Sequence, residues 1–164
     1  MVKIITQKFQ KICLNGHQLC VTSNSPIDPN EFCPKCGASV ISTCQSCNAP
    51  IEGWYENDNI VYIGSRNAEK PAYCKKCATP YPWTEQILNN AIELIALDDN
   101  LSDDDKQLIK TAIPDLLVDT PKTQLAEAKF KKVFPKVSTF VKDSMYNLLV
   151  DVLSDAAKKS LFPD

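Results

Sequence analysis

The chain has 164 residues, with 18 basic and 20 acidic side chains and a formal net charge of −2. This length suits one or two small domains, and the charge balance argues against a general nucleic-acid binder, which needs a basic face for many phosphates. With only 4 glycines, no phosphate-binding glycine loop and no H-E-x-x-H sequence, the chain offers no catalytic motif. We expect a protein that is not an enzyme.

Residues 1–12 show neither the apolar core nor the cleavage site of a secretory signal peptide. A cytoplasmic location is therefore expected, where thiols stay reduced. In that setting, cysteines at regular short spacing predict metal binding rather than disulfides.

The cysteines and the single histidine gather in four clusters in the first half of the chain. They are Cys13, His17, Cys20, Cys33, Cys36, Cys44, Cys47, Cys74 and Cys77. Two thiolates in a C-x-x-C pair lie on one tight turn, and two such turns can close a tetrahedral zinc site. The pattern predicts structural zinc.

Chain reach separates these clusters into two sites. Residues 39–42 have the β-branched character of a strand, and an extended segment between the two neighbouring C-x-x-C turns would span roughly 20 Å. That distance is too long for both turns to hold one ion. We expect two zinc ions: Cys13, Cys33 and Cys36 with His17 or Cys20 hold the first, and Cys44, Cys47, Cys74 and Cys77 hold the second. His17 is favoured over Cys20 because Gly16, just before it, can supply the positive φ of a tight turn.

The three C-x-x-C turns share a layout. In the first, Pro34 presets the turn and Gly37 ends it. Asn48 and Ala78 take the place of Gly37 in the other two. Asn tolerates the left-handed conformation, whereas Ala78 costs free energy if positive φ is required there.

The segment between Cys47 and Cys74 predicts a hairpin stapled at its base by the second zinc ion. Trp54 and Tyr55 would form one arm, residues 57–59 the turn, and residues 60–63, Ile-Val-Tyr-Ile, the other arm. Trp54 and Tyr55 are the candidate binding residues on this hairpin.

The remainder of the chain reads as helical. One helix is expected at residues 84–97 with Thr84 as its N-cap, a second starts at Ser102 and ends or kinks at Pro114, and a third runs from Thr120 toward residue 133 or 134. The organisation expected is a double zinc-ribbon domain at residues 1–83 and a helical domain of about four helices at residues 84–164, which is α+β overall.

The last helix, expected at residues 138–159, carries a wide apolar stripe. Its members are Phe140, Val141, Met145, Leu148, Leu149, Val152, Leu153, Ala156 and Ala157. Such a stripe usually forms the core of a helical domain. The alternative is a docking surface for a protein partner or a second copy, because short helices offer little area to bury it. Regularly spaced charges exclude a transmembrane span.

The cysteine turns resemble those of double zinc-ribbon proteins. The sequence C-L-N-G-H at residues 13–17, the paired knuckles, P-Y-P-W-T-E at residues 80–85 and D-T-P-K-T at residues 119–123 together look like a bacterial family of uncharacterised proteins. The resemblance covers most of the chain. It implies an architecture but no activity.

Three functions fit these observations. The favoured one is a structural-zinc interaction module or adaptor that binds protein partners through its zinc hairpins and its C-terminal helix. A nucleic-acid-associated regulator would use the knuckle lysines Lys35, Lys70, Lys75 and Lys76 with Trp54 or Tyr55. A redox- or metal-responsive protein would release its metal on oxidation, or hold iron in place of zinc.

Overall fold

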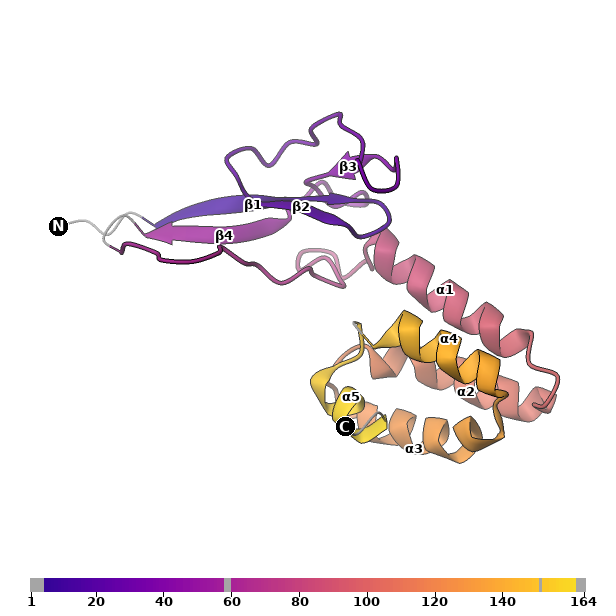
Figure 1. Cartoon of the computed structure of the whole chain (residues 1–164). Helices are drawn as coiled ribbons and strands as arrows, with labels where there is room; N and C mark the ends of the chain where they lie inside the picture. The colour runs from indigo at the N-terminus through magenta and orange to yellow at the C-terminus, as the bar shows by residue number, and fades with distance from the viewer. Residues whose placement is uncertain (1–4, 58–59, 151, 162–164) are drawn as a thin grey trace. The chain divides into compact units, whose positions relative to one another are not determined.

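The computed structural model describes residues 5–57, 60–150 and 152–161 (Figure 1). The chain divides into two compact units, Met1–Glu85 and Gln86–Asp164. The first holds an antiparallel sheet and the cysteine clusters, and the second is helical. The α+β class expected from the sequence is confirmed.

Strand β1 (Ile5–Cys13) is the centre of the sheet. It pairs along one edge with β2 (Gln18–Ser23), and it also pairs with β3 (Val40–Ile41) and β4 (Glu52–Asn57), all antiparallel. In the register with β3, Cys13 lies opposite Val40. The strand that carries the first cysteine therefore joins the sheet to the first cluster.

Sequence analysis did not predict β1, and Gln10 explains why. This polar residue occupies a core position, where it is only 1% exposed. Its Nε2 donates to the carbonyls of Glu52 and Glu69, both at 2.8 Å, and its Oε1 accepts from Gln18 Nε2 at 2.6 Å. The side-chain amide of Gln10 can be buried because other segments of the chain supply its hydrogen-bond partners. An apolar residue at this position would have indicated a strand, but a glutamine does not.

The hairpin expected between Cys47 and Cys74 is wrong in its pairing. Its first arm becomes β4, but β4 pairs with β1, with Tyr55 opposite Gln7. Residues 60–63 form no strand, and residues 58 and 59 of the expected turn lie outside the described part of the chain. The long strand β1 offers β4 a longer pairing partner than residues 60–63 would in a local hairpin.

The described residues contain five α-helices and one 3-10 helix, against about four expected. They are α1 (Pro82–Ala96), α2 (Asp103–Leu116), α3 (Thr123–Val133), η1 (Phe134–Lys136), α4 (Thr139–Leu149) and α5 (Asp155–Leu161). Ser102 caps α2 as expected, since its side chain accepts from the Asp105 N–H at 3.2 Å. Pro114 lies in the final turn of α2, which ends two residues later.

Two helix starts differ from expectation. Helix α1 begins at Pro82, and Thr84 is not its cap, because the Thr84 hydroxyl donates to the Ala72 carbonyl at 2.8 Å. Helix α3 begins at Thr123. The Thr123 N–H donates to the Thr120 carbonyl at 3.0 Å, and the Thr120 N–H donates to Thr123 Oγ1 at 2.9 Å. Because residues 120–123 form this closed turn, the helix begins at Thr123 and not directly after Thr120.

The single long helix expected at residues 138–159 is wrong, because the structure divides it into α4 and α5. Ser154 explains the division. Its hydroxyl accepts from the Ala157 N–H at 3.3 Å, and its own N–H donates to the Leu116 carbonyl at 3.0 Å. A serine that caps a new helix competes with continuation of the old one.

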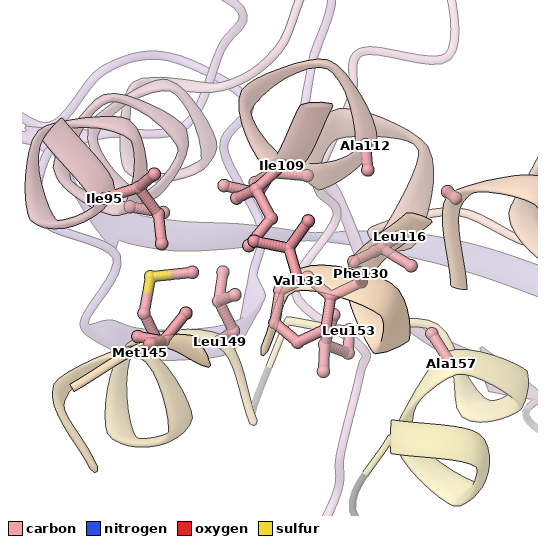
Figure 2. Packing of buried hydrophobic residues seen from close by; sticks show 14 of the residues in the cluster. Ile95, Ile109, Ala112, Leu116, Phe130, Val133, Met145, Leu149, Leu153 and Ala157 are labelled. Carbon is pink, nitrogen blue, oxygen red and sulfur yellow. The ribbon is translucent and has the colours of Figure 1, made fainter. Parts of the chain in front are cut away.

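The helical unit has one core, which absorbs most of the predicted apolar stripe (Figure 2). Met145 and Leu149 of α4 point toward Ile95 of α1 and Ile109 of α2, and all four side chains are fully buried. Phe140, by contrast, is 75% exposed. The stripe is thus mainly core, and only its margin faces solvent.

Candidate metal centres

The three C-x-x-C turns have the same backbone geometry. The carbonyls of Cys33, Cys44 and Cys74 each accept a hydrogen bond at 2.8 Å from the N–H four residues later. That later residue has positive φ in every turn: 72° at Gly37, 56° at Asn48 and 60° at Ala78. The expectation that Asn48 and Ala78 replace Gly37 in the left-handed conformation is confirmed. The chain reverses sharply, so both cysteine side chains of a turn face one point.

Residues 13–17 form a related reversal at the end of β1. The Gly16 N–H donates to the Cys13 carbonyl at 2.8 Å, and Gly16 has a φ of 84°. The His17 N–H donates to Cys13 Sγ at 3.2 Å. A Cβ added at Gly16 would lie 2.8 Å from the Trp83 Cβ, so a side chain has no room there. Glycine is therefore required both by the turn and by the packing.

The first cluster consists of Cys13, His17, Cys33 and Cys36, whose ligand atoms all lie within 4.8 Å of one another. His17 Nδ1 is 3.5 Å from Cys13 Sγ and 3.6 Å from Cys33 Sγ. Cys13 Sγ is 3.7 Å from Cys36 Sγ. Strand β1 and the first C-x-x-C turn thus contribute to one site.

The second cluster consists of Cys44, Cys47, Cys74 and Cys77, again within 4.8 Å. Cys44 Sγ lies 3.7 Å from Cys77 Sγ, and Cys47 Sγ lies 3.7 Å from Cys74 Sγ. Two turns separated by the long insertion therefore meet at this site. As in the first cluster, two ligands are buried, one is half-buried and one is exposed.

These distances fit a four-coordinate metal ion. Bonds of about 2.3 Å to sulfur and about 2.0 Å to nitrogen place tetrahedral sulfur atoms about 3.8 Å apart and a nitrogen about 3.5 Å from a sulfur. The observed separations of 3.7 Å between sulfurs and 3.5–3.6 Å to His17 are close to those edges. A disulfide would need about 2.05 Å. Each cluster could therefore hold one metal ion.

Hydrogen bonds favour the thiolate form in the exposed ligand of each cluster. The Ala38 backbone N–H is the main group that lowers the pKa of Cys36 to about 6, helped by the Asn15 amide, which donates to Cys36 Sγ at 3.4 Å. The Thr79 side chain has the same role for Cys77, whose pKa is also lowered to about 6. Thiolate is the form that binds metal. Sequence analysis missed Asn15, which lies between Cys13 and His17, and Thr79, which directly follows the third C-x-x-C turn.

Cys20, the alternative ligand, lies outside both clusters. It is in β2 opposite Lys11, and its Sγ is 3.7 Å from Thr22 Oγ1. The structure places His17, not Cys20, beside Cys13, Cys33 and Cys36.

Asp28 is a further residue that sequence analysis did not single out. Its Oδ1 accepts from the backbone N–H groups of Ser42 and Thr43, at 2.7 and 3.0 Å, and from the Thr43 hydroxyl at 2.9 Å. These bonds fix the link between the first and second C-x-x-C turns. A lone aspartate in a loop gives no sequence signal for such a role.

The candidate binding residues Trp54 and Tyr55 lie side by side on β4, away from the ligand clusters. Their rings stack with centroids 5.7 Å apart, and Tyr62 meets Trp54 edge-on at 5.1 Å. Tyr55 is 56% exposed. The two residues therefore belong to an aromatic surface group, not to the metal clusters.

Two clusters of metal-ligand residues on paired knuckle turns, followed by a helical unit, define a protein with two candidate metal centres in its first unit. Across the described residues, no helix is both long and apolar enough to cross a membrane. Residues 6–161 match a family model described as "Uncharacterized protein conserved in bacteria (DUF2321)", and the chain belongs to that family. Neither the curated proteins nor the solved structures include a significant match to it.

Proposed function

We propose that this protein is a non-enzymatic interaction module that two structural zinc ions hold rigid while it binds a protein partner. The observation that carries the proposal is that each cluster already provides four ligand atoms within 4.8 Å of one another. A catalytic zinc ion keeps one position open for water, whereas a structural ion has four protein ligands. The proposal places the protein in a reducing compartment, such as the bacterial cytoplasm, where cysteines free to bind metal stay reduced.

The aromatic group on β4 supports the binding of a partner through the first unit. Tyr62 meets Trp54 edge-on, and Val61 and Ile63, which flank Tyr62 in the chain, are 89% and 97% exposed. Apolar side chains this exposed, grouped with aromatic rings, are characteristic of protein interfaces. The first unit therefore presents an apolar surface that its own fold does not use.

A capture experiment tests this proposal. The intact, metal-loaded chain is immobilised and exposed to bacterial lysate, beside a Tyr55→Ala variant and a Val61→Ser variant. Tyr146→Ala, which changes a 44% exposed tyrosine of the helical unit, is the matched control. We expect a partner that binds the wild type and the control but is depleted at least about tenfold on the two variants. Equal capture by all four proteins would contradict the proposal.

The nucleic-acid alternative has less support. Of the four knuckle lysines, Lys70 donates to the Gly16 carbonyl at 3.1 Å, and Lys75 is paired with Glu52. Titration of a labelled single strand at several salt concentrations tests it, since the slope of affinity against salt counts phosphate contacts. Tight binding with a steep slope would favour the regulator over the adaptor.

A further inference from the structure

A groove runs between α1 and α4 in the helical unit, where the two helices lie side by side (Figure 1). It has a volume of about 460 Å³, and Leu94, Leu97 and Leu148 form its apolar surface. A second hollow of about 300 Å³ shares Leu94 and Leu97 and adds Phe140 at the start of α4. The two hollows form one continuous surface on the helical unit.

The core accounts for only two of the four large apolar residues of this groove, Leu94 and Leu148, which are partly buried against it. Helices α1 and α4 pack together through Ile95 and Met145, which are fully buried. Leu97 and Phe140 are instead 74% and 75% exposed. Large apolar side chains that gather in a hollow and remain exposed mark a binding surface more often than isolated ones do.

The charged residues that line the groove have one sign, although Lys106 lies beside it and donates to the Ala96 carbonyl at 3.0 Å. Its lining includes Glu93, Asp98 and Asp99 and no lysine or arginine. The buried Asp98 carboxylate accepts from the backbone N–H groups of Ser138 and Asn100. Glu93 and Asp99 are exposed, and neither has a salt bridge within the described part of the chain. An occupant with basic side chains would supply the missing partners.

We propose that this groove binds a basic amphipathic helix of a partner protein. An apolar groove between two helices takes leucine-like side chains at positions i, i+3 or i+4, and i+7 of a helix. Lysine or arginine beside those positions would meet Glu93 and Asp99. The inference rests on the proposed interaction function but places a contact on the helical unit, separate from the aromatic group on β4.

Two other occupants fit the groove less well. In a second copy of this chain, α3 and its N-cap residue Lys122 offer exposed Lys122 and Lys132 and half-buried Lys129, but only one exposed large apolar residue, Leu125. One leucine cannot fill a surface made by three leucines and a phenylalanine. An anionic membrane surface would be repelled by the acidic rim.

Peptide binding tests the proposal directly. The probe is a fluorescein-labelled 18-residue helix with leucines on one face and lysines on the other, titrated into the intact, metal-loaded protein at about 0.15 M salt. Two control peptides have the same leucine face with glutamates, and the same leucines and lysines in scrambled order. We expect saturable binding of the first peptide, and at least about tenfold weaker binding of each control, about 1.4 kcal/mol.

Substitutions on the protein locate the site. Leu97→Ser, Phe140→Ala and Glu93→Lys should each weaken binding of the leucine–lysine peptide by about tenfold. Leu125→Ala and Asp119→Lys, matched changes at exposed positions outside the groove, should leave binding unchanged. Unchanged melting temperatures verify that all five variants fold, since the substituted side chains are exposed.

Three outcomes would overturn the proposal. They are failure of the intact protein to bind the peptide, equal weakening by Asp119→Lys and Glu93→Lys, and light scattering that shows a dimer lost on Phe140→Ala. The second outcome means general attraction to an acidic protein, and the third means that a second copy fills the groove. The proposed function is judged separately by capture on the Tyr55→Ala and Val61→Ser variants, in which the groove is intact.

Discussion

At the scale of single residues, the three C-x-x-C turns differ most at their fourth position after the first cysteine. Gly37, Asn48 and Ala78 all adopt positive φ there. Glycine does so at almost no cost, asparagine at a small one, and alanine against the steric clash of its Cβ with the backbone, about 1–2 kcal/mol. The third turn therefore contains strain that the first does not.

Ala78→Gly should stabilise the protein, and Gly37→Ala should destabilise it. The strain relieved by glycine exceeds the entropy that glycine adds to the unfolded chain. We therefore expect the free energy of unfolding to rise by about 0.5–1 kcal/mol in Ala78→Gly and to fall by about the same amount in Gly37→Ala. A Cβ at Gly37 meets no atom within 4 Å, so crowding adds nothing to the cost there. Chemical denaturation of the metal-loaded protein measures both. As a control, Ala128→Gly on the exposed face of α3 should destabilise by about 1 kcal/mol. Loss of stability in Ala78→Gly would contradict this account of the turn.

Asp98 is a buried acid, and the stability of the folded protein depends on the charge of its carboxylate. Burial raises its pKa, but hydrogen bonds from the Ser138 and Asn100 backbone N–H groups outweigh burial, and its pKa is lowered from 3.8. A group with a lowered folded pKa stabilises above its unfolded pKa, and that stability is lost as pH falls through the folded value. Asp98→Asn should cost about 1–3 kcal/mol at neutral pH and less below about pH 4. Urea unfolding of both proteins across this range measures the difference. A gap of equal size at every pH would show that the carboxylate charge is not involved.

At the scale of elements, each metal cluster combines ligands from two separate turns. Cys13→Ser removes a buried ligand atom from the first cluster, whereas Cys20→Ser changes a side chain of β2 that lies outside both clusters. We expect two zinc ions per chain in the wild type and in Cys20→Ser, and one in Cys13→Ser, because an incomplete structural site binds metal weakly. Elemental analysis of the purified proteins counts the ions and identifies the metal. Equal metal loss from both variants would mean that Cys20 is a ligand.

The two sides of α4 should respond differently to truncation. Leu149 is fully buried among the helices, and Leu149→Ala should cost about 2–5 kcal/mol through lost burial and the cavity left behind. Phe140, 75% exposed on the same helix, is the matched control, and Phe140→Ala should change stability by less than about 0.5 kcal/mol. Thermal unfolding of the two variants and the wild type measures both changes in stability. Similar effects from both substitutions would mean that the stripe is not divided between core and surface.

At the scale of the whole molecule, each unit has its own hydrophobic core. The core of the first unit packs Ile12, Ile51 and Trp83 together with cysteines of the second cluster. The core of the second unit contains no cysteine. Small metal-ligand folds obtain much of their folding free energy from the ion. The two units should therefore differ in their dependence on metal.

Removal of metal should unfold the first unit and leave the second folded. Both tryptophans, Trp54 and Trp83, lie in Met1–Glu85, so their fluorescence reports that unit, while far-ultraviolet circular dichroism reports mainly the helices. With excess chelator we expect a shift of the tryptophan emission to longer wavelength and a largely retained helical signal. Adding zinc back should reverse the shift. Loss of both signals together would mean that the two units fold as one.

The local parts of this structure could be predicted from the sequence, because their geometry depends on residues close together in the chain. The C-x-x-C turns, with their positive φ at Asn48 and Ala78, and the cap at Ser102 each depend on a few neighbouring residues. The reach argument for two sequential sites is also local, since it uses only the length of one segment. The helical character of the second half follows from its composition and periodicity.

Only the tertiary structure decided which distant segments meet. Strand β1 went unpredicted because the partners of Gln10 come from residues 18, 52 and 69, and β4 pairs with β1 and not with residues 60–63. The proximity of His17, and not Cys20, to the other ligands depends on the path of β2. The apolar stripe became core at Leu149 and a groove wall at Leu148 because burial depends on where the facing helix lies. Spacing along a chain fixes which side chains share a turn or a helix face, but the surface that face meets is a property of the folded molecule.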